Sequence, residues 1–402
     1  MIFQSFPNFN IYSSPLLILS VQGLIFAFLL FKRYLDKKAL SDILLSLIIL
    51  ITCYHRTTYT IGFMDWYDTY QNTKINYYVV DLSMILAPLL YFYVRSVTCS
   101  AFKISRKHSV HFIPWLIFLF IKILILFSDA SSPDFDSVQN GEMVINFQWK
   151  YLDPIVYLFS MLQMIVYLAL TFQLFYAYRQ KIKDFFSNTY SVELNWLRNF
   201  LYIYAFLFLF NSVQTIVNEL IVDLKWTQEW WYHFFSAILI IYIGVKGYFT
   251  PVGNLKALGF EYLDFGFSQK KEDTTKHTIA VNKKEELSPK LVKTKEFLSS
   301  YMQNEKPYLD PDMTLVTLAK QLDVSREELS EVINKGFRSK FNDFINGYRI
   351  EAIKQMLSEN KQAELSLTGI AYECGFNSKA TFNRVFKKMT RLSPSDFINT
   401  LK

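Results

Sequence analysis

The sequence predicts an all-α protein in which a seven-transmembrane helical bundle precedes a cytoplasmic domain with two helix-turn-helix units. Three observations predict this fold. The chain is rich in apolar and aromatic residues up to about Phe249, it turns charged and polar after Thr250, and its C-terminal part repeats one helical pattern. Apolar residues make up 51% of the chain and aromatic residues 18%. These shares are high for a soluble protein of this length, and the excess lies in the first part.

The first part contains seven stretches that can cross a membrane as helices, each needing about 20 mostly apolar residues. They are residues 13–32, 40–62, 76–96, 109–128, 153–178, 196–221 and 230–249. No Lys or Arg precedes Lys32, and no small-residue cleavage site follows the first stretch. We therefore expect a retained span there and not a signal peptide.

The charges of the loops alternate along the chain. Cations collect after the first, third and fifth stretches, whereas the other loops hold one cation each and several carboxylates. The collected cations are Lys32, Arg33, Lys37, Lys38, Arg95, Lys103, Arg106, Lys107, Arg179, Lys181, Lys183 and Arg198. Loops rich in Lys and Arg stay in the cytoplasm. We expect a protein of the bacterial inner membrane with its N-terminus outside and its C-terminus cytoplasmic.

Several predicted spans carry polar residues toward their outer ends. These residues are His55, Arg56, Asp81, Lys122, Asn211, Gln214, Asn218, Glu219 and His233. Ionisable groups are costly in hydrocarbon and usually face the bundle interior or water. Asn211, Gln214 and Asn218 share one helix face. Two interpretations remain open. In one, residues at the helix ends extend to the lipid headgroups and the rest form hydrogen bonds between helices. In the other, they line a polar pocket, open to the outside, that receives a signal and passes it through the last span.

The two main parts are joined by a predicted flexible linker, residues 250–287, and a connecting helix, residues 288–306. The linker is polar and charged from Lys270 to Lys284, which is typical of a tether. Ser288-Pro289 is a helix start with a capping residue followed by Pro. The helix has an apolar face that includes Leu298 and Met302. That face either packs on the following domain or forms a dimer contact.

Residues 307–402 contain the repeated helical pattern. In the first unit, Leu318 and Ala319 lie on a buried helix face, Asp323-Val324 makes a turn, and Ser325 with Glu328 predicts a capping box at the next helix. The second unit repeats this plan. Its buried positions, turn and cap are Leu367, Ile370, Ala371, Gly375-Phe376, Ser378, Phe382, Val385 and Phe386. An amphipathic helix from about Phe341 to Leu357 connects the two units.

This segment resembles the AraC/XylS family of transcription regulators. The resemblance covers residues 308–398 and is carried by Leu318-Ala319, Leu329-Ser330, Phe341 to Asn346, Tyr348-Arg349-Ile350, Ala352, Ile370-Ala371, Cys374 to Ser378, Phe382 to Lys388 and Ser393-Pro394. By arrangement alone, residues 1–249 resemble the multi-span sensor domain of the membrane-tethered branch of that family. The resemblance implies that the second helix of each unit enters a major groove of double-stranded DNA.

The resemblance also implies a set of DNA-binding residues. They are Arg326, Glu327, Ser330 and Glu331 in the first unit, and Lys379, Ala380, Thr381, Asn383, Arg384, Lys387 and Lys388 on the exposed face of the second. The first set is net acidic, which favours weak DNA binding by that helix. Two glycines of the family pattern are replaced by Arg338 and Arg391. A positive φ at either position would cost stability.

The function predicted from these features is a membrane-bound, sequence-specific DNA-binding transcription regulator. It would couple an extracytoplasmic or membrane signal to promoter binding. Its partners would be double-stranded DNA, the lipid bilayer, an unknown small-molecule or protein signal and, as one option, a second copy of the chain. The alternative is a membrane transporter or channel regulated by a C-terminal helix-turn-helix domain.

The sequence favours a protein without enzymatic activity. No nucleophile, phosphate loop or paired carboxylate stands out, and no cofactor or metal site is predicted. The three cysteines, Cys53, Cys99 and Cys374, are scattered along the chain. Their positions suggest neither a disulfide nor a metal cluster.

Overall fold

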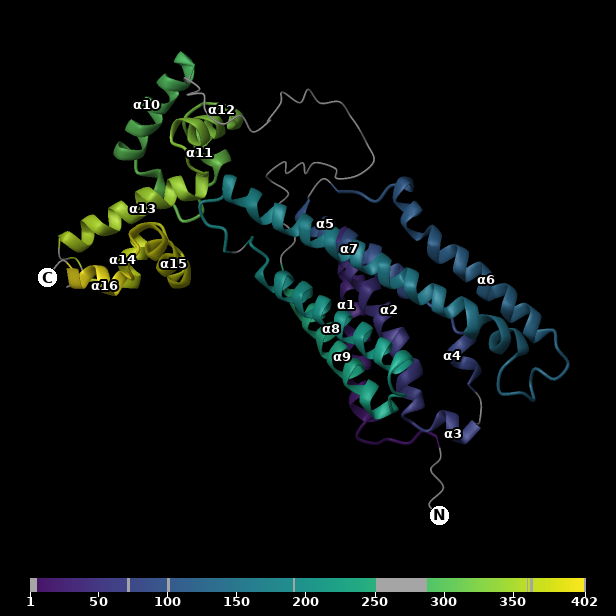
Figure 1. The fold of residues 1–402 in the computed structure, drawn as a ribbon. Helices are drawn as coiled ribbons and strands as arrows, with labels where there is room; N and C mark the ends of the chain where they lie inside the picture. Colours follow the sequence, from purple (N-terminus) through teal and green to yellow (C-terminus); the bar gives the residue numbers. More distant parts are fainter. Residues whose placement is uncertain are drawn as a thin grey trace. The chain divides into compact units, whose positions relative to one another are not determined.

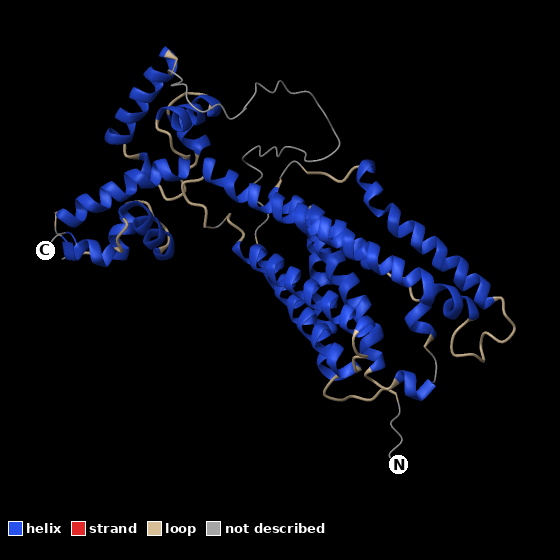
Figure 2. Cartoon of the chain, viewed as in Figure 1, coloured by secondary structure: helices blue, strands red, loops and turns tan. Residues whose placement is uncertain are grey.

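The computed structural model describes residues 6–70, 73–99, 102–190, 192–250, 288–359, 361 and 364–400. These residues form helices joined by loops and contain no strand beyond an isolated bridge between Phe186 and Thr314 (Figures 1 and 2). The chain divides into two compact units. One unit contains the chain up to Phe175 and the helices that follow Asn195; the other joins Tyr176–Leu194 to the C-terminal helices. The predicted linker, residues 250–287, lies outside the described residues except for Thr250.

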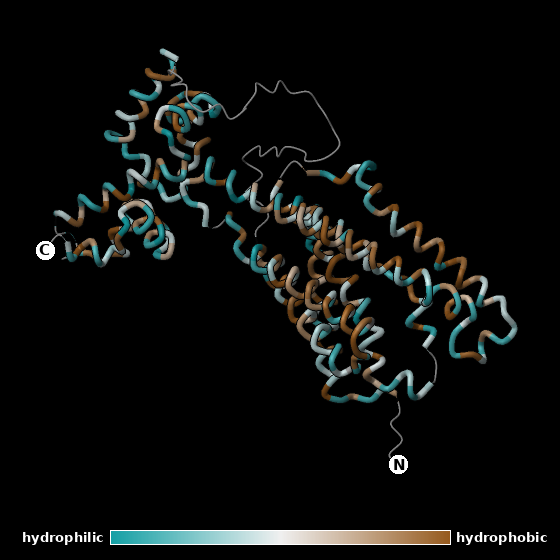
Figure 3. The backbone as a smooth tube through the Cα atoms, viewed as in Figure 1, coloured by the Kyte–Doolittle hydropathy of each residue, from teal (hydrophilic) through white to brown (hydrophobic). Residues whose placement is uncertain are grey.

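The first unit contains the apolar helices, except for the end of α7 after Phe175, which belongs to the second unit. They are α1 (Ser13–Lys37), α2 (Leu40–Gly62), α3 (Trp66–Tyr70), α4 (Lys74–Tyr78), α5 (Ser83–Thr98), η1 (Arg106–Phe112), α6 (Ile113–Ala130), η2 (Val144–Leu152), α7 (Asp153–Lys181), α8 (Asn195–Leu220) and α9 (Trp226–Phe249). Helix α1 packs against α2 and α9, α2 packs against α5, and α8 packs against α9. Figure 3 shows hydrophobic residues along the longer of these helices.

Six helical segments among the described residues are long and apolar enough to cross a membrane. They correspond to six of the seven predicted stretches. Large apolar side chains lie exposed on them, such as Phe28 at 65%, Phe120 at 62% and Phe206 at 64% exposure. Apolar surface of this extent on a long helix is suited to lipid contact. The N-terminal region is therefore membrane-spanning in character.

The predicted span 76–96 is not one continuous helix. Helix α4 ends at Tyr78 and α5 begins at Ser83, which leaves α5 with 16 residues. Such a helix is about 24 Å long, shorter than a hydrocarbon core of about 30 Å. The break has a local cause, because the Asp81 carboxylate accepts a hydrogen bond from the Ser83 amide (2.8 Å) and so competes with helical pairing.

Neighbouring helices satisfy the backbone of this break. The Leu82 amide donates to His55 Nε2 (2.9 Å), and Trp115 Nε1 donates to the Asp81 carbonyl (2.7 Å). Irregular backbone is tolerated at membrane depth only when protein groups bind it in this way. Hydropathy did not reveal the break because apolar residues continue through it.

The second unit contains shorter, amphipathic helices. They are η3 (Ile182–Asp184), α10 (Pro289–Asn304), η5 (Pro307–Leu309), α11 (Leu315–Gln321), α12 (Arg326–Glu331), η6 (Val332–Gly336), α13 (Phe341–Ser358), α14 (Leu367–Glu373), α15 (Lys379–Thr390) and α16 (Pro394–Thr400). The N-terminal half of α13 contributes Phe341 and Ile345 to one core, which includes α11 and α12. Its C-terminal half contributes Ile350 and Ile353 to a second core with α14 and α15. Helix α13 therefore joins the two helix pairs.

Helix α10 packs on the C-terminal domain. Leu298 and Met302 are fully buried in the first core, so the apolar face is covered within the chain and the packing interpretation holds.

The predicted capping box at α12 is wrong in its second half. Ser325 Oγ accepts from the Glu328 amide (3.1 Å), but the Glu328 carboxylate accepts from Thr294 Oγ1 (2.8 Å) and pairs with Lys290. The hydrogen bond from Lys290, with that from Thr294, lowers the pKa of Glu328.

The two helix pairs share one turn geometry. Asp323 and Gly375 have φ of 51° and 89°. The Val324 amide donates to the Ala319 carbonyl (3.0 Å), and the Phe376 amide donates to the Ala371 carbonyl (2.9 Å). Both turns therefore close one pair of helices with a residue in the left-handed region.

The two arginines that replace family glycines also have positive φ. The angle is 50° at Arg338 and 67° at Arg391. The left-handed region costs a residue with a Cβ about 1–2 kcal/mol. The positive φ considered for Arg338 and Arg391 from the sequence is therefore present at both positions, and it strains the backbone there.

Candidate DNA interface and membrane cavity

Helix α15 presents a basic exposed face. Ser378 Oγ accepts from the Thr381 amide at its start, and Phe382, Val385 and Phe386 are buried in the core below. The positions left exposed are Lys379, Ala380, Asn383, Arg384, Lys387 and Lys388. Thr381, which the sequence analysis placed on this face, is 6% exposed. That placement is wrong because Thr381 lies in the first turn on the side that packs inward.

Two cations of α15 have acidic neighbours in the same unit. Arg384 Nη2 lies 3.6 Å from Glu193 Oε1, and Lys388 Nζ pairs with Asp343 of α13. Both cationic side chains remain more than half exposed. Exposed pairs of this kind contribute little, typically below about 1 kcal/mol. They can be exchanged for other anions at small cost.

The polar residues of α12 pair mainly within their own helix and the turn that follows it. Arg326 Nη2 lies 2.7 Å from Glu327 Oε1, and Lys335 Nζ lies 2.9 Å from Glu331 Oε1. Ser330 Oγ accepts from Asn334 Nδ2 (3.2 Å). The face remains acidic overall, which disfavours close approach to phosphates.

Arg349 is a fully buried cation. In the sequence it stood out only as one residue of the family pattern. Its guanidinium donates to the carbonyls of Tyr308 and Asp310, each at 2.7 Å. Burial lowers its pKa to about 10, so it stays charged near neutral pH. It fixes the chain before α11 to the middle of α13, and so sets the position of the first helix pair on that helix.

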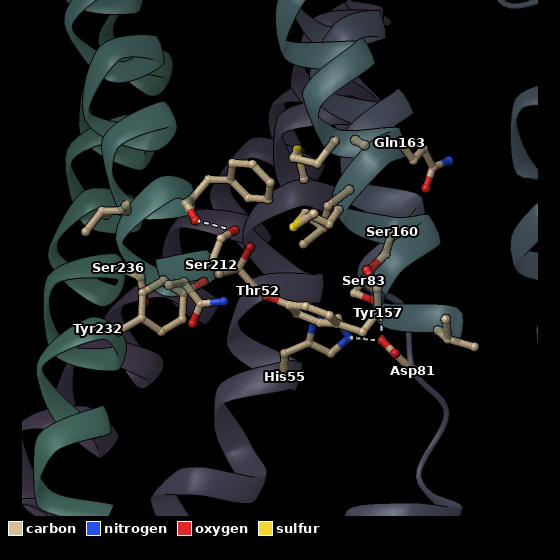
Figure 4. A pocket seen from close by; sticks show the side chains of 18 of the residues that line it. Thr52, His55, Asp81, Ser83, Tyr157, Ser160, Gln163, Ser212, Tyr232 and Ser236 are labelled. Carbon is tan, nitrogen blue, oxygen red and sulfur yellow. Dashed lines mark hydrogen bonds and ion pairs between the residues drawn. The ribbon is translucent and has the colours of Figure 1, made fainter. Parts of the chain in front are cut away.

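A cavity of about 480 Å³ lies among the helices of the first unit. Four residues of the predicted pocket line it: His55, Asp81, Lys122 and Asn211. Figure 4 shows further polar side chains around it. These are Thr52, Ser83, Tyr157, Ser160, Gln163, Ser212, Tyr232 and Ser236. Helices α2, α5, α6, α7, α8 and α9 all contribute to its lining.

The cavity wall contains charged groups and unpaired polar groups. Lys122 Nζ lies 4.0 Å from Asp153 Oδ1, and His55 Nε2 lies 3.5 Å from Asp81 Oδ1. His55 Nε2 also accepts a hydrogen bond from the Leu82 amide. Tyr157 OH and Gln163 Oε1 are buried and have no hydrogen-bond partner among the described residues. Buried polar groups in this condition are costly unless water or a ligand pairs with them.

The other predicted pocket residues lie elsewhere in the first unit. Arg56 is buried and donates to Ser236 Oγ (3.0 Å), and the His233 ring lies 3.6 Å from the Tyr59 ring. Gln214 Nε2 donates to the Gln228 carbonyl (3.1 Å), while Asn218 Oδ1 accepts from the Leu224 amide (2.8 Å). The side chain of Glu219 lies outside the described residues.

Comparison with known proteins identifies the C-terminal domain. Residues 318–400 match the family described as a helix-turn-helix domain. The HTH-type transcriptional regulator CdhR of Pseudomonas aeruginosa is 27% identical over 88 residues, 22% of this chain and 25% of its own length. The uncharacterized HTH-type transcriptional regulator YijO of Escherichia coli is 32% identical over 85 residues, 21% and 29% of the two chains.

A third relative comes from Pseudoalteromonas carrageenovora. It is an uncharacterized HTH-type transcriptional regulator in the cgkA 5' region, 35% identical over 89 residues, 22% of this chain and 51% of its own. The chain thus spans between a quarter and about half of these relatives' length. No solved structure is significantly similar to it. The resemblance to AraC-type regulators is confirmed for the C-terminal domain.

Proposed function

We propose that this protein is a membrane-bound, sequence-specific DNA-binding transcription regulator that couples an extracytoplasmic or membrane signal to promoter binding. One observation carries the proposal. The described residues combine six helical segments suited to cross a membrane with a helix-turn-helix domain of the AraC type. A regulator of this kind needs no catalytic group.

Helix α15 is the main DNA-contacting helix in this proposal. Arg384 is suited to guanine and Asn383 to adenine, since both make paired hydrogen bonds with those bases in the major groove. Lys379, Lys387 and Lys388 are suited to phosphates. Helix α12 would enter the next groove, about 34 Å away. Because the carboxylates of α12 repel phosphates, this helix would bind DNA more weakly than α15.

Substitutions on α15 test this assignment. Arg384→Ala should cost about 1–3 kcal/mol at one base position, whereas Lys388→Ala should weaken binding to all sequences alike and reduce the salt dependence. The full-length chain in nanodiscs would select duplexes from a random library, and titration of the selected duplexes would give both quantities. Lys293→Ala on the exposed face of α10 is the charge-matched control. If the base preferences stay unchanged in Arg384→Ala, α15 is not the helix that recognises the DNA sequence.

The proposal also requires the C-terminal domain to lie in the cytoplasm. The alternation of cations predicts an exterior location for Asn140 and Asp223 and a cytoplasmic one for Lys402. A phosphatase that is active only outside the cell should therefore be active when fused at Asn140 or Asp223 and inactive at Lys402. A fluorescent protein that matures only inside should give the opposite pattern. Phosphatase activity at Lys402 would rule out a role in transcription.

The cavity is the proposed signal site. It combines a lysine, carboxylates and two buried polar groups that have no hydrogen-bond partner in the described part of the chain, in a mostly apolar setting, as ligand sites commonly do. A polar or zwitterionic small molecule would satisfy these groups. Such a ligand changes DNA binding only if it prefers one of two arrangements of the helices.

A further inference from the structure

The connection between α7 and α8 belongs to the same compact unit as the helix-turn-helix domain. We call residues 184–194 the α7–α8 segment, and Ser191 within it lies outside the described residues. The Leu315 amide donates to the Phe185 carbonyl (2.9 Å), and the Ser187 amide donates to the Met313 carbonyl (3.1 Å). These two bonds form the antiparallel bridge between Phe186 and Thr314. The segment is therefore paired with the backbone that begins α11.

Side chains of α13 hold the same segment. Asn342 Nδ2 donates to the Ser187 carbonyl (2.7 Å), and Arg349 Nη2 donates to Ser187 Oγ (3.2 Å). Ser187 is 1% exposed. At the start of the segment, Lys340 Nζ lies 3.1 Å from Asp184 Oδ1. Buried, directional contacts of this kind define a built interface and not a chance approach of a loop.

The α7–α8 segment also contacts the arginines of both second helices. The Phe185 ring lies 5.8 Å from the guanidinium of Arg326 on α12. Glu193 lies 3.6 Å from Arg384 on α15. The Glu193 side chain is 8% exposed and is held by Thr189 Oγ1 (2.6 Å) and Arg179 Nη2 (3.2 Å). Its carboxylate is therefore fixed where a cation of the DNA-contacting face can reach it.

We propose that the docked α7–α8 segment competes with DNA for the helix-turn-helix domain. Glu193 pairs with the guanidinium of Arg384, so it occupies the group that would contact DNA. Its fixed negative charge also repels the phosphate backbone. This inference rests on the proposed function, because it assumes that Arg384 contacts DNA.

The segment is continuous with two helices that line the membrane cavity. Helix α7 contributes Tyr157 and Gln163 to the cavity wall, and α8 contributes Asn211 and Ser212. A ligand that changes the arrangement of α7 against α8 would strain or relax the segment that joins them. This route is distinct from the one through the last span that the sequence suggested. Docked and undocked forms of the segment would be the two states that coupling between distant sites requires.

Removing the charge of Glu193 tests the competition. The full-length Glu193→Gln chain in nanodiscs should bind a duplex selected by the wild-type chain about fivefold more tightly, which is the upper range for a partly exposed ion pair. Glu296→Gln, an equal change of charge on the exposed face of α10, should leave the affinity within experimental error. In an Arg384→Ala background, Glu193→Gln should have a smaller effect, because only the repulsion between the carboxylate and the phosphate backbone is then removed. Equal or weaker binding by Glu193→Gln would overturn the proposal.

A disulfide across the bridge tests the docking itself. Phe186 and Thr314 form a pair without mutual hydrogen bonds, for which the Cα separation is about 4.5 Å, within the disulfide range of about 4.4–6.8 Å. The Phe186→Cys, Thr314→Cys chain should cross-link on oxidation and lose at least tenfold in affinity for the duplex, and reductant should restore it. Each single-cysteine variant is a control for the loss of the native side chain.

The outcomes of the cross-link separate the two proposals. Failure to cross-link would contradict the docked segment, and full affinity in the cross-linked form would contradict competition. If the wild-type chain selects no duplex at all, the proposed function fails. The cross-linking yield would still report whether the segment docks.

Discussion

Replacing Gly375 by Ala is expected to unfold the second helix pair. Gly375 has a φ of +89°, which costs a residue with a Cβ about 1–2 kcal/mol. An added Cβ would also overlap the Tyr308 carbonyl oxygen and come within 2.9 Å of the Leu309 carbonyl and of Arg349 Nε. None of these atoms can move freely, because Arg349 holds the chain before α11. We expect a loss of about 3 kcal/mol or more, in the range that indicates a strained core position.

Gly347 provides the matched control, since the same substitution there should have the opposite sign. It lies within α13, and an added Cβ would meet nothing within 4 Å. Gly347→Ala should gain about 0.5–1 kcal/mol, because Gly is a poor residue inside a helix. Hydrogen exchange of α14 and α15 in the full-length chain would measure both effects. Equal protection in the two variants would show that the turn does not need its left-handed residue.

Local features of the C-terminal domain were predictable from the sequence. Ser288, Ser325 and Ser378 each accept a hydrogen bond from an amide in the first turn of their helix, because capping depends on only a few consecutive residues. The left-handed position at Gly375 follows from an equally short pattern, whereas the one at Arg391 was expected from the resemblance to the family. The alternation of apolar residues was sufficient to place both cores.

Features that depend on distant residues were not predictable. Glu328 has the spacing of a capping box, but Lys290 and Thr294 of α10 take its carboxylate instead. The hydrogen bond from Arg349 to Ser187 joins residues 162 positions apart. No periodicity in the α7–α8 segment predicts this contact. The backbone groups at the break before α5 are bound by His55 and Trp115 of other helices, and the sequence around the break does not reveal these partners.

The direction in which the polar side chains of the spans point was not predictable from the sequence. Asn211 and Gln214 share a helix face by spacing, yet Asn211 lines the cavity whereas Gln214 donates to the Gln228 carbonyl. Which part of a helix face meets a cavity is decided by the packing of neighbouring helices. The spacing of residues on one helix contains no information about that packing.

This difference between two neighbouring amides gives the sharpest test of the signal site. Asn211→Leu should remove a polar group from the cavity wall and abolish the response of the regulated genes. Gln214→Leu, the same change one helical turn away and outside the cavity, should leave the response intact. A ligand can act only through its preference for one arrangement of the helices, so the loss of its contacts removes the signal but not the capacity to bind DNA.

Transcript profiles across a panel of growth conditions would measure the response whatever the chemical identity of the ligand. Strains carrying wild type, Asn211→Leu, Gln214→Leu and a deletion would be compared at equal membrane abundance. Genes that vary with conditions in the wild type should stay constant in Asn211→Leu and vary normally in Gln214→Leu. A normal response in Asn211→Leu would exclude its amide from sensing. Failure of Asn211→Leu alone to accumulate in the membrane would assign that amide to the packing of the bundle, because a buried amide that pairs between helices stabilises them whether or not a ligand is bound.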